Sequence, residues 1–158
     1  MDFFEFRSKV AILNPSKGNE IKKKYITTFI DTTRKWYFDN IATKHKCVDG
    51  DCYDGYLWDC LLNKDVISQA QIKEFALQHK DLDVYVFWDT HSCEKILIPN
   101  YWKFGKEAVI RLNFEVLLSG LNFLPEDIYI FDGTFEWTIV LTHEDIDGIP
   151  FYLMCNKK

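Results

Sequence analysis

The pair Asp132-Gly133 lies between two segments of strand-like alternation, and it constrains the fold more than any other feature of the sequence. Asp-Gly is a strong signal for a two-residue hairpin turn, because Gly adopts positive φ at no steric cost. With these residues as the turn, Ile128 is expected to lie opposite Trp137. Residues 127–144 are therefore predicted to form an antiparallel hairpin.

Directly opposed residues of an antiparallel pair point to the same face, so this register divides the hairpin into two surfaces. One surface is apolar and consists of Ile128, Ile130, Phe135, Trp137, Ile139 and Leu141. The other is mostly polar and consists of Asp127, Tyr129, Phe131, Thr134, Glu136, Thr138 and Thr142. We predict one buried and one exposed face, with Trp137 in the core and Glu136 turned outward.

The rest of the chain predicts further elements around this hairpin. Residues 14–19 have turn composition, and apolar spacing predicts a helix from Glu20 to about Trp36. A short buried helix over 56–62 precedes a second helix that begins at a Ser68–Gln71 capping box. Strands are expected at 84–88 and 96–98, paired as a hairpin, followed by a helix over 106–119. A final strand over 151–155 is expected at an edge, since Pro150 lies at its start.

These elements predict one α+β domain over residues 1–158. Its sheet is expected to be largely antiparallel, with a C-terminal three-stranded meander plus a preceding hairpin packed against helices. Strands and helices do not alternate in the way that builds a parallel sheet.

Composition indicates an ordered globular chain of 158 residues in which aromatic residues make up 16%. No apolar run is long enough to span a membrane, and the N-terminus lacks the pattern of a signal peptide. Five cysteines, an odd number, favour reduced thiols over a disulfide framework. We therefore expect a cytoplasmic protein without a membrane partner.

The net charge of −5 is unevenly distributed along the chain. Residues 1–48 contain ten Lys and Arg against five Asp and Glu, so residues 1–48 carry +5 and residues 49–158 carry −10. This asymmetry predicts a basic N-terminal part and an acidic remainder. The overall acidity argues against a nucleic-acid partner.

The segment His45–Gly55 is rich in metal-binding residue types but lacks the spacing of a known site. Counted from Asp49 as an EF-hand, the loop has Tyr53 at a ligand position and Cys60 where a bidentate Glu is needed. A zinc site is not indicated because no second ligand pair follows at suitable spacing. An acidic surface loop is the favoured interpretation, and no metal or cofactor is predicted.

Residues 127–144, with Gly55-Tyr56-Leu57-Trp58 and the strand Tyr85–Trp88 followed by His91, resemble an uncharacterised family of short bacterial proteins. That family has a C-terminal W-T-x-V-x-T-H-E segment. The likeness covers about the last two-thirds of the chain. The Gly148–Phe151 ending departs from the Gly-Pro-aromatic pattern expected there. The resemblance implies a bacterial source and this general fold, and it implies no activity.

Two groups of residues are candidates for catalysis. His143 and Glu144 are proton-transfer residue types, but neighbours on a strand point to opposite faces, which favours a structural, hydrogen-bonded His143 at the rim of the core. Asp89, His91 and Cys93 occur on one loop, where nucleophilic catalysis requires Cys and His within hydrogen-bond reach. An ordinary connection is favoured for this loop.

Two classes of function remain. The favoured one is a non-catalytic protein-binding protein, of the immunity or antitoxin type, that caps a partner with a basic surface. Aromatic and acidic residues suit such an interface, and the candidates for contact are Asp49, Asp51, Tyr53, Asp54, Tyr56, Trp58 and Asp59. The alternative is a small hydrolase or metal-dependent enzyme that uses His143, Glu144 and His91.

Overall fold

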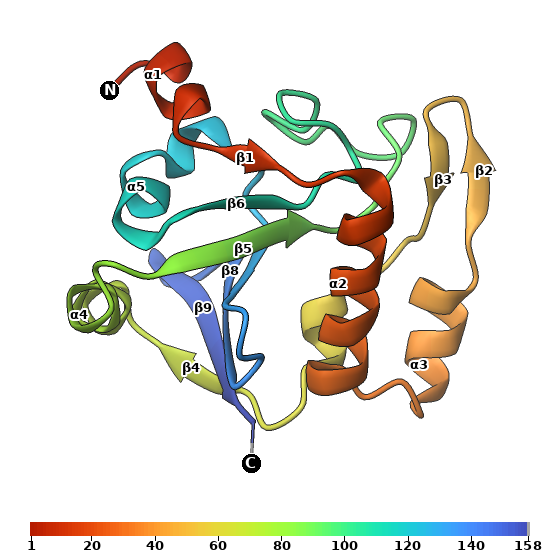
Figure 1. Ribbon diagram of the computed structural model, residues 1–158. Helices are drawn as coiled ribbons and strands as arrows, with labels where there is room; N and C mark the ends of the chain where they lie inside the picture. The colour runs from red at the N-terminus through yellow and green to blue at the C-terminus, as the bar shows by residue number, and fades with distance from the viewer. Residues whose placement is uncertain (158) are drawn as a thin grey trace.

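The alternating segments assemble into one seven-stranded antiparallel sheet in a computed structural model that describes residues 1–157 (Figure 1). The order across the sheet is β1-β6-β5-β7-β8-β9-β4. The strands are β1 (Ala11–Ile12), β4 (Asp65–Ile67), β5 (Asp83–Trp88), β6 (Ile110–Asn113), β7 (Ile128–Phe131), β8 (Trp137–Ile146) and β9 (Ile149–Asn156). A separate hairpin consists of β2 (His45–Cys47) and β3 (Gly50–Cys52). The predicted α+β class with a largely antiparallel sheet and a C-terminal meander is confirmed.

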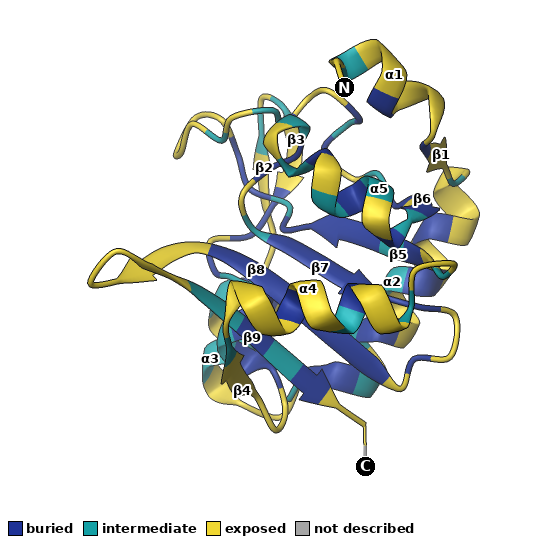
Figure 2. Cartoon of the chain, turned by 90° about the vertical axis from the view of Figure 1, so that its left-hand side faces the viewer, coloured by how far each residue is buried: buried dark blue, intermediate teal, exposed yellow. Residues whose placement is uncertain are grey.

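Helices cover both faces of the sheet, so its central strands lie between two cores (Figure 2). The first face carries α1 (Phe3–Ser8), α4 (Gln69–Gln78), α5 (Phe114–Ser119) and the 3₁₀ turn η3 (Leu121–Phe123). The second carries α2 (Pro15–Phe29), α3 (Lys35–Tyr37), the π-helical turn η1 (Phe38–Ala42) and the 3₁₀ turn η2 (Leu57–Cys60). Within residues 1–157, no helix combines the length and the apolar character needed to cross a membrane.

The central hairpin pairs in a different register from the one predicted. Ile128 of β7 lies opposite Leu141 of β8 rather than opposite Trp137, a displacement of four residues. Because side chains alternate with period two, an even displacement leaves the strand residues on their predicted faces. Trp137 is therefore buried and Glu136 exposed, as predicted, although the predicted cross-strand partners are wrong.

The register differs because the Asp-Gly pair does not form a two-residue turn. A type I′ turn needs positive φ at both central residues, and Gly133 does not adopt it. Instead, the Asp132 carboxylate accepts hydrogen bonds from the backbone and hydroxyl of Thr134, which lengthens the loop. Phe135 takes the positive φ (54°) and packs on Phe131, with ring centroids 5.3 Å apart. Phe135 thus belongs to the second core, and its predicted face is wrong.

The hairpin face predicted to be polar is buried as well. Tyr129, Phe131 and Val140 are fully buried in the core beneath α2. The Tyr25 ring of α2 lies 4.9 Å from the Phe131 ring, and its hydroxyl is hydrogen-bonded to Thr138 at 2.8 Å. The apolar stripe of α2 therefore covers a surface that the hairpin pattern alone assigned to solvent.

Local capping sets the beginnings of the two longest helices. Ser68 and Gln71 form the predicted capping box at the start of α4. Residues 14–19, predicted as a loop, instead begin α2, because the Asn14 side chain accepts a hydrogen bond from Lys17 N and Pro15 occupies the first turn. The helix ends at Phe29, earlier than predicted.

The strand predicted at 96–98 is absent, and β5 pairs instead with β6 and β7. β6 lies within the segment predicted to be helical, where Ile110 and Leu112 alternate with Arg111 across the sheet. Within this segment only α5 is helical. Asn113 caps its start, because the Asn113 side chain accepts hydrogen bonds from backbone N–H groups of the first turn. The apolar residues of this segment have a spacing that is compatible with a helix, so the sequence analysis did not identify the short strand β6.

The last strand is not at an edge, which corrects a further expectation. β9 is paired along one side with β8 and over residues 152–154 with β4. Pro150 lies outside the β4 pairing, so its missing N–H costs no hydrogen bond there. The strands at the edges of the sheet are the short β1 and β4.

Candidate functional site

The residue after β5 is a buried aspartate whose carboxylate is hydrogen-bonded to two tyrosine hydroxyls and a backbone amide. Asp89 follows Trp88 and is buried, and its side chain accepts hydrogen bonds from the hydroxyls of Tyr53 (2.7 Å) and Tyr129 (2.6 Å) and from Leu57 N (3.0 Å). Burial raises the pKa of Asp89 to about 6, and the tyrosine hydrogen bonds act against that rise. Asp89 thereby joins residues 53–57 to the sheet.

The loop that follows β5 does not assemble a Cys-His pair. His91 is buried, and its Nε2–H donates to the Gly55 carbonyl at 2.6 Å. Cys93 is exposed, and its pKa is raised by the hydrogen bond with Asp49, which disfavours the nucleophilic thiolate. No hydrogen bond within residues 1–157 joins His91 to Cys93. His91 lines two cavities, one of about 10 Å³ shared with Asp89 and one of about 230 Å³ shared with Asp54 and Lys95, and both are smaller than usual ligand pockets.

His143 is hydrogen-bonded to a carboxylate and is separated from His91 by the Tyr56 ring. Its Nδ1 lies 2.9 Å from Asp127, which also accepts hydrogen bonds from His143 N and from Trp58 Nε1, each at 3.1 Å. The Tyr56 ring lies 5.1 Å from His143 and 4.8 Å from His91. The two histidines are thus separated by an aromatic ring and line different cavities.

A β-bulge gives His143 its orientation. The pairing of β8 with β9 is regular up to Leu141 and resumes at Asp145, with a register shift between them. Beyond the shift, His143 packs against Tyr56 and Trp58, which lie on the second face, whereas Leu141 lies in the first core. The predicted continuation of the apolar face to His143 is therefore wrong, although the histidine is hydrogen-bonded at a rim.

An open cavity of about 520 Å³ lies beside His143 and is acidic. Glu126, Glu144 and Asp145 line it, together with Asn100, Pro125, Pro150 and Tyr152. Among residues 1–157, no Lys or Arg lines it and the three carboxylates form no ion pair. We call this cavity, with its three carboxylates and His143, the acidic groove.

No family model, curated protein or solved structure matches this chain. The candidate site is therefore defined by its geometry alone.

Several residues predicted to contact a partner are used within the fold instead. Tyr53 and Trp58 are buried, and Tyr56 and Asp59 are half-buried. Asp54 is paired with Lys95 at 2.6 Å and with His45 at 2.9 Å. Of the predicted acidic loop, Asp51 remains exposed and forms no ion pair in the described chain.

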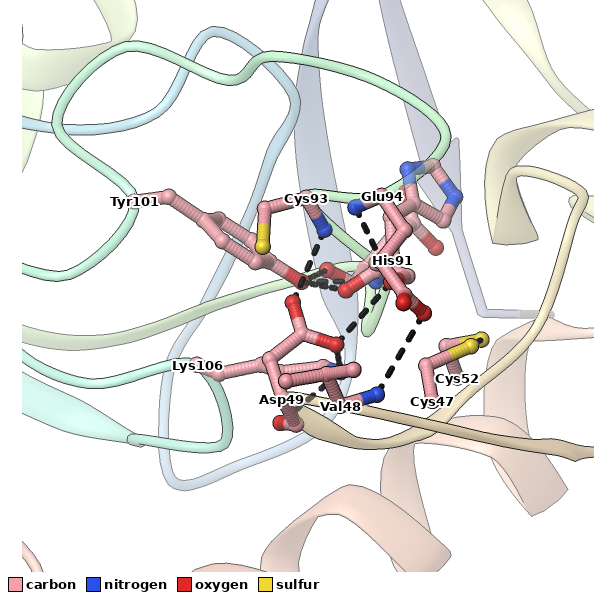
Figure 3. A network of polar contacts seen from close by, with 11 residues as sticks. Cys47, Val48, Asp49, Cys52, His91, Cys93, Glu94, Tyr101 and Lys106 are labelled. Atoms are coloured by element: carbon pink, nitrogen blue, oxygen red, sulfur yellow. Dashed lines mark hydrogen bonds and ion pairs between the residues drawn. The ribbon is translucent and has the colours of Figure 1, made fainter.

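Asp49 has an internal role at the turn of the β2–β3 hairpin (Figure 3). Its carboxylate accepts hydrogen bonds from Cys93 N (2.8 Å) and Ser92 Oγ (3.0 Å), and the buried Lys106 lies 3.5 Å away. These contacts, the Cys93 backbone hydrogen bond first, hold the pKa of Asp49 well below its usual range. Asp49 therefore fastens the hairpin to the loop that follows β5.

Replacement of Asp49 with Asn is expected to lower the melting temperature by several degrees. The substitution removes the anion beside Lys106 and places an amide donor against Cys93 N, and an unpaired buried charge is strongly destabilising. Asp51→Asn, an exposed change of the same kind two residues away, is the control and should leave the melting temperature almost unchanged. Thermal unfolding followed by circular dichroism checks this, and equal melting temperatures for the two variants would contradict it.

Cysteine and metal chemistry add little to the site. Cys47 and Cys52 approach with their sulfur atoms 2.9 Å apart across the β2–β3 hairpin (Figure 3), and all five cysteines are free. Within residues 1–157, no group of three or more His, Cys, Asp or Glu side chains is placed to hold a metal ion.

Sequence reasoning placed Asp145 in the candidate group with His143 and Glu144, but it missed Glu126 and Asp127 as residues of the site. The sequence does carry a signal for these residues at Pro125-Glu126-Asp127, where two charged residues precede a buried strand. Their approach to Glu144 and Asp145 depends on the β7–β8 pairing and on the bulge, neither of which the sequence pattern specified.

Proposed function

We propose that this chain is a non-catalytic binding protein that holds a cationic segment of a partner protein in the acidic groove. The observation that carries the proposal is the set of three carboxylates, Glu126, Glu144 and Asp145, which share one open cavity without a cation among the described residues. Like charges brought together raise the free energy of the folded state, and a cationic partner removes that repulsion.

Exposed apolar side chains adjoin the groove and supply contact area. Ile146 and Ile149 are 58% and 66% exposed at the tip of the β8–β9 hairpin, next to groove residues Asp145 and Pro150. Leu97, 87% exposed, lies two residues before the groove residue Pro99. Exposed apolar groups beside complementary charge are typical of protein interaction sites.

Charge distribution supports a partner with a basic surface. The net charge of residues 49–158 is −10, and all groove residues belong to this part of the chain. A field of one sign steers an oppositely charged partner and accelerates association. An immunity or antitoxin-type protein, which caps a basic partner, uses this chemistry, and we propose that class for the chain.

Removal of the groove charges is expected to weaken binding of cationic peptides at least about tenfold, since charged contacts contribute on the order of 0.5–1 kcal/mol each at partly exposed sites. The variant is Glu126→Gln/Glu144→Gln/Asp145→Asn. The probes are peptides of about 15 residues in which Lys or Arg alternates with apolar residues. Affinity and association rate are measured by biolayer interferometry across a salt series, and association should slow as salt rises.

The matched control removes three charges elsewhere. Glu74, Asp81 and Glu136 are exposed and form no ion pair among the described residues, so Glu74→Gln/Asp81→Asn/Glu136→Gln has the same net charge as the groove variant. It should retain nearly wild-type affinity. Equal loss in both variants would show a non-specific effect of net charge and would remove the groove from the proposal.

A second candidate function is hydrolysis at the same cavity. It is favoured by the His143–Asp127 contact, since a carboxylate that holds Nδ1 orients a histidine as a general base. Glu144 lies beside it, whereas His91 is turned into the interior. Turnover of chromogenic esters or phosphoesters that disappears in a folded His143→Gln variant would establish the enzyme in place of the binding protein.

A further inference from the structure

A second cavity, of about 360 Å³, lies on the second face of the sheet and has the opposite charge. It is enclosed by α2, the turn η1 and the end of β5. Three lysines line it: Lys22 and Lys23 from α2, and Lys44 from the segment after η1. Its lining also contains Tyr37, Tyr53, Phe87, Leu57, Ile41 and Thr90. The acidic groove is lined by residues of the first core, so the two cavities lie on opposite faces of the sheet.

The three lysines of this cavity form no ion pair within the described chain. Lys22 Nζ donates a hydrogen bond to the Glu107 carbonyl at 3.0 Å and lies 5.7 Å from the centre of the Phe87 ring. It is therefore held at the wall of the cavity with donor capacity remaining, because an ammonium group has three N–H donors. Lys22 is half-buried, and the partial desolvation of its charge is unfavourable unless an anion compensates it.

The electrostatic surroundings of Lys22 agree with this placement. Burial lowers the pKa of Lys22 to about 8; Glu107 and Asp89 oppose that change, and Lys44 adds to it. The Glu107 carboxylate is exposed at the cavity and forms no ion pair in the described chain. At neutral pH Lys22 therefore carries a positive charge in a partly desolvated position, and Lys23 and Lys44 are exposed beside it.

The walls of the cavity are suited to a flat apolar group. Phe87 and Leu57 are almost fully buried, and Tyr53 is 8% exposed, so these side chains form a rigid floor. The Tyr25 ring packs on Phe87 from the side of α2, with centroids 5.0 Å apart. Aromatic and aliphatic walls with a few placed charged groups are the usual composition of a small-molecule site.

We propose that this cavity binds a small organic anion, a carboxylate or phosphate attached to a planar or apolar group. Lys22 and Lys44 hold the anionic end, and the half-buried Tyr37 and Ile26 contact the planar part above the buried floor. The proposal is independent of the acidic groove.

Calorimetric titration with phenyl phosphate, benzoate and inorganic phosphate tests the site. We expect saturable binding of phenyl phosphate or benzoate, and weaker binding of inorganic phosphate because it lacks the planar group. The double variant Lys22→Gln/Lys44→Gln should bind at least tenfold more weakly. Lys22→Arg, which keeps the charge, should retain most of the affinity lost in Lys22→Gln.

The control is Lys73→Gln, which removes an exposed lysine from α4 on the other face and should bind as the wild type does. Circular dichroism establishes that each variant is folded. Affinity should also fall as pH rises above about 8, where Lys22 loses its proton, and binding should be accompanied by proton uptake there. Absence of saturable binding at millimolar ligand would overturn the proposal, as would equal loss in Lys73→Gln.

Discussion

Replacement of Asp89 with Ala is expected to reduce the free energy of unfolding by about 3–5 kcal/mol at pH 7, since each unpaired buried polar group costs about 1–3 kcal/mol. The substitution leaves the hydroxyls of Tyr53 and Tyr129 and the Leu57 N–H without their acceptor. Urea unfolding measures the change. Asp81→Ala, an exposed substitution of the same kind, should cost little.

The pH dependence of stability gives Asp89 a separate signature. Its pKa is about 6 in the folded protein and close to the ordinary aspartate value of 3.8 when unfolded. Because the folded pKa is the higher one, ionisation of Asp89 disfavours the folded state, so the wild type is most stable below pH 4 and loses part of the Asp89 contribution as pH rises through about 6. A difference of about two pKa units corresponds to about 3 kcal/mol. The difference between wild type and Asp89→Ala should therefore shrink between pH 4 and pH 7. A constant difference would contradict an elevated pKa.

Replacement of Trp137 with Ala is expected to cost about 3–5 kcal/mol, as large aromatic truncations in cores do. Trp137 is 7% exposed and packs between Phe114, with stacked rings 5.9 Å apart, and Phe75, with centroids 4.8 Å apart. Its loss opens a space between α4, α5 and the sheet that these helices cannot fill without moving.

The control for this substitution is Trp102→Ala, which truncates a tryptophan that is 54% exposed. It should change the free energy of unfolding by much less. Denaturant unfolding of both variants checks the difference. Similar values for the two would show that Trp137 does not fill the first core.

The sequence shows that the protein has an acidic surface but does not show which residues form it. The acidic surplus is visible in the composition, but the residues first identified for it, Asp49 and Asp54, are engaged with Ser92, Cys93 and Lys95. Long-range contacts decide which carboxylates are neutralised, because opposite charges far apart in sequence meet only in the folded chain. Composition therefore predicts an acidic surface without locating it.

The sequence alone determined features that depend on local physics. Period-two alternation placed Trp137 inward and Glu136 outward, and the Ser68–Gln71 spacing located a helix start. Both results depend on side-chain direction or hydrogen bonds within a few residues. They remain correct despite the wrong register, because a displacement of four residues does not exchange the faces of a strand.

Only the tertiary structure decided which surfaces meet. The second face of the hairpin is buried because α2 covers it, and β5 pairs with β6 and β7 rather than with residues 96–98. The β7–β8 pairing brings Glu126 and Glu144 together at the acidic groove. The packing of η1 beside α2 brings Lys44 and Lys22 together at the second cavity, on the other face of the sheet. These contacts depend on the balance of burial over the whole chain, and no local pattern contains that balance.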